Sequence, residues 1–484
     1  MHTPRICFAA LAALLLAPAA ASAQARASVP VLDTAIARMG GAARLASVQR
    51  VRLEMLTQWQ RTTFAEGPYG DAPSYELNTE LRDYTRGAWR NTRRSHAGGA
   101  WREVVDVVLD SVAIRHLPAG FPSPSAPGGW GPLNVAYVDE RRELFALAPE
   151  RLLLGLRAAP DLRALPDTVA GGVRYARVAG TVDGFRATVL VRRGDGFPAS
   201  VHFAADAPND FGLVPWGRME VAVHYSGWRP QEGLVYPFQW DVARVGRPYK
   251  RMSILAARFN PEAAPDSFAV SDSLRAAYLA TARRPMHDVP LASAKRVGTR
   301  FVSFATFGAP AGAVKVGGRW LLLEAGQAPL SAQRAAQWLA GADPGSRAGG
   351  AIVTLPAPGN GGVAHVARER LPVYAAPGAL PYIAAMLRGH GLTSAPPAPV
   401  RSARWVILAG DSVWMEPIDL PDAPGAMLVY VPALEWVYSG TMANPLHRGL
   451  VLARVCGRGW AVTRAGAPTP AFDAPTRANL CAAP

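Results

Sequence analysis

Lysine is nearly missing from this 484-residue chain: only Lys250, Lys295 and Lys315 occur among 51 basic residues. The formal net charge of +15 would suit a nucleic-acid-binding protein. The arginines, however, are spread over the whole length with acidic residues between them, and no basic stripe interleaved with aromatic residues forms. The pattern argues against a nucleic-acid partner. It leaves peripheral contact with an anionic membrane surface as a lesser alternative.

Long apolar runs are missing except at the beginning of the chain. Arg5 precedes the apolar run Ile6–Leu16, and the small residues Ala21 and Ala23 flank Ser22 before Gln24. This order is typical of a cleavable signal peptide, and the run is too short for a permanent membrane anchor. We therefore expect a signal peptide at residues 1–23, cut after Ala23, and a periplasmic or secreted protein.

Cysteine is almost as scarce as lysine, with three residues in all. Cys7 lies in the apolar N-terminal run, so that Cys456 and Cys481 remain after signal removal. No Cys-x-x-Cys motif occurs, which argues against redox catalysis. An even pair in an oxidising compartment predicts a disulfide between Cys456 and Cys481 that joins the C-terminal tail to a preceding strand.

Several catalytic motifs are missing too. There is no Gly-x-Ser-x-Gly elbow, no Walker loop and no serine at the Ser-x-x-Lys spacing. Gly359-x-Gly361-x-x-Ala364 imitates a dinucleotide loop, but no acidic residue occurs between Glu369 and Asp411, where the ribose contact would be expected. The common serine hydrolase, nucleotide-hydrolase and dinucleotide signatures therefore do not apply.

Two domains are expected from the length, at residues 24–285 and 286–484. The first opens with a short helix, a Gly40-Gly41 break and a helical turn that ends near Ser47. Alternation of apolar and polar residues then predicts many strands and one helix at Asp139–Leu156. The predicted strands are 51–59, 77–90, 102–115, 173–179, 186–193, 198–204, 217–226, 235–245 and 249–258. Such closely spaced strands favour a large, curved antiparallel sheet.

The opening segment Leu32–Val48 and the closing strands up to Phe259-Asn260-Pro261 resemble the LolA/LolB lipoprotein carriers over residues 30–270. This resemblance implies a half-barrel wrapped around a helix, with a concave face that holds acyl chains. The alternative is a concave face that is filled by the domain's own side chains.

The second domain shows a different pattern, in which strands alternate with helices after paired hairpins. This order is typical of a layered α/β fold. The predicted strands are 300–306, 311–316, 319–324, 351–354, 373–375, 404–409, 412–416, 426–431 and 435–438, and the predicted helices are about 330–340, 362–369 and 380–387. A short helix at about 273–282 is predicted in the connection before this domain.

This order resembles the metallo-β-lactamase superfamily over about residues 290–455. The matching segments are the strand Ala313–Glu324 that ends on an acidic residue, the helix Ser331–Leu339, the loop Ala351–Gly362 and the hairpin Met427–Thr441. The resemblance implies an α/β sandwich of the αββα type, with zinc held by a His-x-His-x-Asp-His loop.

The ligand loop departs from that pattern. Thr354, Pro356, Pro358 and Gly359 stand at the ligand positions, and Thr441 stands where the bridging aspartate belongs. Zinc needs imidazole, thiolate or carboxylate, which threonine, proline and glycine side chains lack. We therefore expect no metal site and no zinc cofactor.

Three candidates remain for a rebuilt cleft: His365, Asp422 and His447. Isolated histidines on helices are more often solvated or structural. We therefore carry three hypotheses. The first is a non-catalytic binding or scaffold protein of the cell envelope, with an apolar or acyl ligand or an envelope protein as its partner. The second is a hydrolase with an altered site, and the third is a lipid or lipoprotein carrier that acts through the N-terminal domain.

Overall fold

A computed structural model describes most of the chain. The described residues are 29–60, 73–97, 100–119, 128–133, 135–206, 217–281, 293–305, 311–326, 328–355, 360–393, 398–408, 410–420, 423, 425–443, 445–466 and 480–481. The predicted signal peptide and four predicted site residues lie outside this set, namely Pro356, Pro358, Gly359 and Asp422.

The first domain is built on one antiparallel sheet of 13 strands in the order β6-β5-β4-β3-β2-β1-β13-β12-β11-β10-β9-β8-β7. Its strands are β1 (Arg50–Gln60), β2 (Pro73–Asp83), β3 (Ala88–Ala97), β4 (Ala100–Leu109), β5 (Val112–Leu117), β6 (Gly129–Pro132), β7 (Arg163–Ala170), β8 (Val173–Val182), β9 (Phe185–Arg192), β10 (Pro198–Asp206), β11 (Arg218–Gln231), β12 (Leu234–Arg244) and β13 (Arg247–Phe259). Its helices are α1 (Pro30–Arg38), α2 (Ala42–Ala46), α3 (Ala136–Ala146), α4 (Pro149–Ala158) and α5 (Asp272–Thr281).

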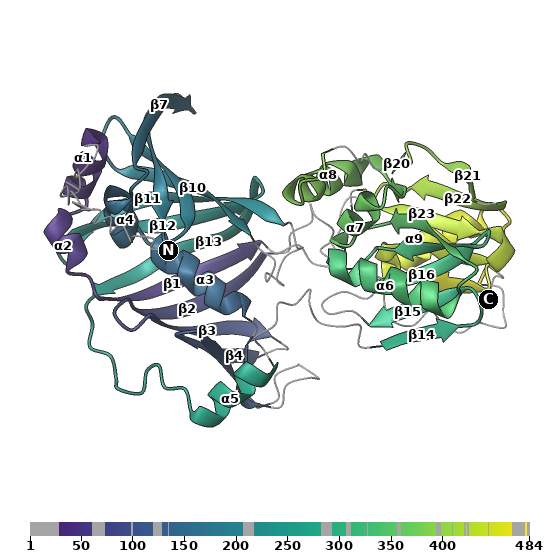
Figure 1. Cartoon of the computed structure of the whole chain (residues 1–484), viewed down its shortest axis with the longest axis horizontal. Coiled ribbons are helices and arrows are strands. Elements are labelled where there is room, and N and C mark those ends of the chain that lie inside the picture. The colour runs from purple at the N-terminus through teal and green to yellow at the C-terminus, as the bar shows by residue number, and fades with distance from the viewer. Residues whose placement is uncertain are drawn as a thin grey trace, which may run out of the picture.

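Alternation along β1 explains which face of the sheet forms the core. Val51, Leu53 and Met55 are buried on one face, while Arg52 and Glu54 point to solvent on the other. Leu152, Leu153 and Leu156 of α4 pack against this buried face, so the helix lies on the concave side of the sheet (Figure 1). The predicted curved antiparallel sheet is thereby confirmed.

Three predicted elements of this domain are wrong. The predicted strands 77–90 and 102–115 are hairpins, because the chain turns at residues 84–87 and at Asp110 and Ser111. The predicted helix at 139–156 is two helices, because Ala148 is extended before Pro149 and proline suits the first position of a new helix.

The second domain contains two sheets. The seven-stranded sheet runs β14-β15-β16-β17-β18-β19-β20 and the five-stranded sheet runs β21-β22-β23-β24-β25. The strands are β14 (Ser293–Val297), β15 (Phe301–Ala305), β16 (Ala311–Val316), β17 (Arg319–Leu323), β18 (Arg347–Val353), β19 (Val373–Ala375), β20 (Ala398–Pro399), β21 (Arg404–Leu408), β22 (Asp411–Pro417), β23 (Met427–Val431), β24 (Trp436–Tyr438) and β25 (Arg464–Gly466). The helices are α6 (Pro329–Ala342), α7 (Val363–Arg368), η3 (Pro377–Ala379), α8 (Leu380–Gly389), η4 (Pro432–Leu434), η5 (Gly440–Ala443) and α9 (Pro445–Cys456).

The two sheets face each other through an apolar layer. Leu321 and Leu323 of β17 pack in one cluster with Val429 of β23 and Trp436 of β24. Helices α6 and α7 cover the outer face of the larger sheet, and α9 covers the smaller one, where Val451 and Val455 pack on the sheet (Figure 1). The predicted layered α/β sandwich is confirmed.

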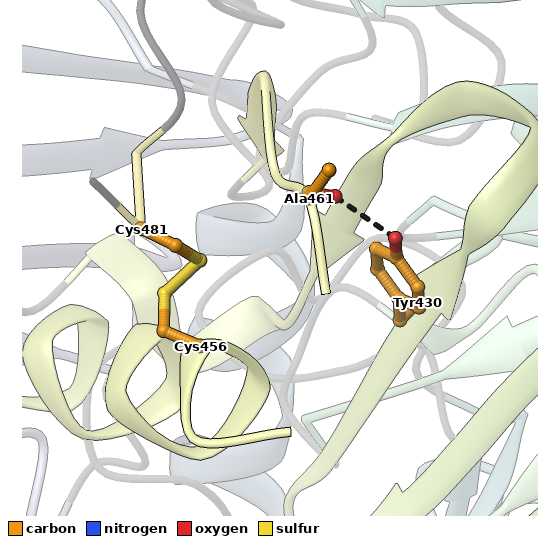
Figure 2. Close-up of a disulfide and its surroundings, with 4 residues drawn as sticks. All are labelled: Tyr430, Cys456, Ala461 and Cys481. Atoms are coloured by element: carbon orange, nitrogen blue, oxygen red, sulfur yellow. Dashed lines mark hydrogen bonds between the residues drawn. A yellow bond between two sulfur atoms is a disulfide. The ribbon is translucent and has the colours of Figure 1, made fainter. Parts of the chain in front are cut away.

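The C-terminal tail is joined to α9 by a disulfide between Cys456 and Cys481 (Figure 2). The predicted pairing is therefore present in the structure. Its predicted location is wrong, because Cys456 ends a helix rather than a strand. That helix was not predicted, and Gly449 lies inside it, where glycine disfavours a helix.

The predicted domain boundary at residue 285 lies between α5 and β14, outside the described residues. Among the described helices, none combines the length and apolar character needed to cross a bilayer.

Candidate functional site

The parallel strands β17 and β18 end at the same edge of the larger sheet. Leu323 pairs with Ile352 in register, so the residues that follow these strands, Glu324 and Thr354, are brought together. The tip of the smaller sheet reaches the same place, where Gly440 follows β24. This edge is where the sequence placed the emptied ligand loop.

Glu324 is the centre of the polar contacts at this edge. Its carboxylate accepts hydrogen bonds from the Thr354 hydroxyl, from the Thr354 backbone N–H at 3.1 Å and from Asn360 Nδ2 at 2.9 Å. The Leu355 N–H lies 3.5 Å from Oε2, and the Tyr438 hydroxyl also bonds to Glu324. The contacts come from both sheets, so the carboxylate ties the sheets together.

Thr354 extends this connection to the smaller sheet. Its Oγ1 donates to Glu324 and accepts the backbone N–H of Gly440 at 2.6 Å. Beside it, the hydroxyls of Ser439 and Thr441 lie 2.9 Å apart. We call Glu324, Thr354, Asn360, Tyr438 and Gly440 the strand-end cluster.

The strand-end cluster is buried. The exposed fraction is 4% for Glu324, 0% for Thr354 and Asn360, and 1% for Tyr438. Burial raises the pKa of Glu324 to about 7, against the lowering effect of its hydrogen bonds. Burial also raises the pKa of Tyr438, and the Glu324 charge raises it further. Two acids are thereby held partly or fully protonated near neutral pH.

The concave face of the first domain holds a second buried polar network. Arg82 donates to Glu80 from Nε at 2.9 Å and from Nη2 at 2.6 Å, and its guanidinium lies 5.4 Å from the Trp240 ring centroid. Burial opposes the Arg82 charge, yet the carboxylates of Glu80 and Glu150 raise its pKa.

Helix α4 joins this network through Glu150, which is 0% exposed. The Tyr84 hydroxyl donates to Glu150, and the Tyr236 hydroxyl lies 3.3 Å from its Oε2. A Cβ on Gly155 would lie 2.6 Å from Val182 of β8, so the helix sits directly on the sheet. In the described residues, side chains of α4 therefore pack against the concave face, where the resemblance implies an acyl site.

The structure does not bring the two described cleft candidates to one site. His365 lines a cavity of about 190 Å³ between α6, α7 and the larger sheet, whose lining contains Trp320 and Leu322 but none of the strand-end cluster. Burial lowers the pKa of His365. His447 is 2% exposed near the beginning of α9, the helix that packs on η5.

No family model matches this sequence, and no curated protein matches it. Among solved structures, a LolA superfamily protein from Nitrosomonas europaea is 10% identical and matches 50% of this chain and 97% of its own, with a TM-score of 0.31. A metallo-β-lactamase from Pontibacter korlensis is 12% identical, matching 36% of this chain and 88% of its own, with a TM-score of 0.29. The inverting sec-alkylsulfatase Pisa1 from Pseudomonas sp. is 10% identical over 36% of this chain and 38% of its own, with a TM-score of 0.29.

The chain joins a LolA-like domain to a metallo-β-lactamase-like domain. Identities of 10 to 12% describe a likeness of fold. They say nothing about activity.

Zinc is the metal that the metallo-β-lactamase-like fold implies, and the residues present do not fit it. Thr354 and Thr441 offer neutral hydroxyls, while the carboxylate of Glu324 already accepts bonds from several donors among the described residues. In the part of the chain that the structure describes, no group of three or more His, Cys, Asp or Glu side chains could hold a metal. The donor set is therefore that of a hydrogen-bonded cluster and not of a metal centre.

Sequence reasoning placed Thr354 and Thr441 near each other but missed Asn360 and Tyr438. The available signal was Glu324 itself, because an acid directly after the buried run Trp320–Leu323 needs buried partners. Which side chains provide them could not be read from the sequence, since Tyr438 lies on a distant strand of the other sheet.

The close packing of the strand-end cluster predicts that Gly440→Ala destabilises the metallo-β-lactamase-like domain. A Cβ at Gly440 would lie 2.6 Å from the Leu355 Cβ and 3.3 Å from both Glu324 Oε1 and Thr354 Oγ1. We expect a loss of about 1–3 kcal/mol in urea unfolding. Gly449→Ala on α9 is the matched control, because nothing lies within 4 Å of its added Cβ. It should be neutral or stabilising, and equal losses in both variants would contradict the packing.

The raised pKa of Glu324 predicts a pH dependence of unfolding. The folded protein holds a proton on this carboxyl between its ordinary pKa of 4.5 and about 7, whereas the unfolded chain does not. The stabilisation from Glu324 is therefore complete below about pH 4.5 and is lost as pH rises to about 7, by about 3 kcal/mol. Urea unfolding of wild type and Glu324→Gln at several pH values isolates this contribution as their difference. A difference that stays constant from pH 4.5 to 7.5 would refute it.

Proposed function

We propose that this protein is a non-catalytic binding or scaffold protein of the cell envelope. The observation that carries the proposal is the closed strand-end cluster, in which Glu324 and Thr354 tie the two sheets where the family's ligand loop would begin. A hydrolytic centre needs an open position for water or substrate. At this edge the described side chains are buried against one another.

Export of the protein is part of the same proposal. Residues 1–23 have the order of a signal peptide, and the Cys456–Cys481 disulfide suits an oxidising compartment. The partner class that we propose is an apolar or acyl ligand or an envelope protein. In the LolA-like domain, an acyl ligand would have to displace α4, whose Glu150 is bound to the sheet.

A screen for hydrolysis tests the proposal against its runner-up, a hydrolase with an altered site. Purified mature protein is assayed with ester, lactone and phosphodiester substrates, alongside His365→Ala and His447→Ala. We expect no turnover above that of a matched blank purification. Turnover that is lost in His447→Ala, in a variant that still folds by circular dichroism, would overturn the proposal.

Native mass spectrometry tests the ligand class separately. The intact protein is sprayed after gentle purification from an envelope fraction. Acyl species that co-purify at stoichiometric amounts would support an acyl ligand, and their absence together with a co-purified envelope protein would support the scaffold form. If both are missing, the proposed partner class is wrong.

A further inference from the structure

The smaller sheet of the metallo-β-lactamase-like domain carries a cluster of three tryptophans. The ring centroids of Trp405 and Trp414 lie 5.2 Å apart, those of Trp405 and Trp460 lie 5.6 Å apart, and those of Trp414 and Trp460 lie 5.5 Å apart. Tyr430 stacks on Trp460 with centroids 4.6 Å apart and planes 9° from parallel. We call Trp405, Trp414, Trp460 and Tyr430 the indole platform.

The indole platform is open to solvent at its outer end. Trp405 is 45% exposed and Ile407, two residues along the same face of β21, is 65% exposed. Strand β21 lies at the edge of the five-stranded sheet, so this exposed face is next to the border of that sheet. An aromatic ring with this exposure, backed by two other indoles, forms a rigid apolar surface the size of one sugar ring.

Charged groups border the indole platform and limit what it can accept. The Arg458 guanidinium lies 4.9 Å from the Trp414 ring centroid and 5.5 Å from that of Trp460. Arg454 and Arg458 both bond to Glu416, at 2.8 and 2.9 Å. Two guanidinium groups against one carboxylate leave a positive charge beside the rings. A cationic ligand is therefore disfavoured, because Arg458 already lies over Trp414 and Trp460 and would repel a second cation. The ring left for stacking is the exposed Trp405.

A disulfide and a hydrogen bond fix the loop that contains Trp460. The disulfide between Cys456 and Cys481 holds the end of α9, four residues before Trp460. On the other side, the Tyr430 hydroxyl donates to the Ala461 carbonyl at 2.8 Å (Figure 2). The rings are therefore held in place before a ligand arrives, which lowers the entropy cost of binding.

We propose that the indole platform is a glycan-binding site for pyranose rings that carry no positive charge. The negative faces of indole rings attract the C–H edges of a pyranose ring, which are slightly positive. Arg454 and Arg458 are 48% and 39% exposed, so their remaining N–H groups are available to hydroxyl or carboxylate groups of the sugar. This site goes beyond the proposed function and does not depend on it, since a hydrolase could carry the same platform.

Calorimetric titration of the full mature chain tests the site with three defined probes: cellohexaose, a hexamer of galacturonate and a chitosan hexamer. We expect saturable binding of the neutral and acidic oligomers and weaker or no binding of the cationic one. Trp405→Ala should weaken binding by about tenfold or more, because stacking on one aromatic ring is lost. Trp405→Phe should retain most of the affinity, and Ile407→Ser should weaken it less than Trp405→Ala.

Trp101→Ala is the matched control, because Trp101 is a 59% exposed tryptophan of the LolA-like domain. It should leave binding unchanged. Three results would each overturn the proposal. The first is that neither cellohexaose nor the galacturonate hexamer binds saturably. The others are equal affinity in wild type and Trp405→Ala, and tighter binding of the chitosan hexamer than of the other two. Concentration-dependent dimerisation that Trp405→Ala abolishes, without glycan binding, would assign the surface to a second copy of the chain instead.

Discussion

Glu324→Ala is expected to lower the stability of the metallo-β-lactamase-like domain by about 3–5 kcal/mol. The substitution leaves the Thr354 and Leu355 N–H groups without their buried acceptor, and Asn360 Nδ2 keeps only its bond to the backbone carbonyl of residue 324. Each orphaned donor costs about 1–3 kcal/mol, and relief from burying a carboxylate offsets part of the sum. Urea unfolding, followed by far-UV circular dichroism and tryptophan fluorescence, measures the change.

Two further variants make this expectation specific. Glu324→Gln keeps the shape and one acceptor oxygen, so its loss should be smaller than that of Glu324→Ala. Glu369→Ala removes an exposed carboxylate from the same domain and should change stability by less than about 0.5 kcal/mol. If Glu324→Ala were as mild as Glu369→Ala, the strand-end cluster would not be what ties the two sheets.

Arg82→Ala is expected to destabilise the LolA-like domain by about 3–5 kcal/mol. The substitution leaves the carboxylates of Glu80 and Glu150 buried without the cation between them, and removes the guanidinium from above Trp240. Arg52→Ala is the matched control on the neighbouring strand, because its pair with Glu54 is about half exposed and such pairs contribute roughly 0–1 kcal/mol. Thermal and urea unfolding of both variants give the comparison.

A double variant separates the ion pair from simple loss of packing. Glu80→Gln with Arg82→Met removes both charges of the pair while keeping most of the volume. We expect it to recover a large part of the stability that Arg82→Ala loses. If the double variant is as unstable as Arg82→Ala, packing around Trp240 and not charge dominates this network.

Alternation of apolar and polar residues predicted several strands whose ends are marked by a turn residue. The hairpin at Asp183 and Gly184 separates two strands that alternation alone predicts well. The turn at residues 84–87 was missed although Gly87 adopts a positive φ of 57° there, and the turn at Asp110 was missed because Asp110 adopts a positive φ of 55° with no glycine or proline beside it. Pro149 was read inside one helix, although it begins a new one.

The candidate sites were less predictable than the fold. The positions of Thr354 and Thr441 followed from the resemblance, and the structure brings both to one edge. His365 was one candidate for a rebuilt cleft, and it lies at the cavity beside Trp320. The contacts of Glu150 with Tyr84 and Tyr236 join strands on either side of β1 and β13, so no local pattern contains them.

The zinc content of the purified mature protein, together with its unfolding temperature with and without a chelator, tests the central claim most directly. The strand-end cluster connects the two sheets through the hydrogen bonds of Glu324 and Thr354. We therefore predict zinc well below one equivalent by elemental analysis, and the same unfolding temperature in chelator and in added zinc. The contrary result is one or more equivalents of zinc, together with a lower unfolding temperature and loss of a measurable activity when the zinc is removed. It would show that a metal, and not the strand-end cluster, holds the two sheets.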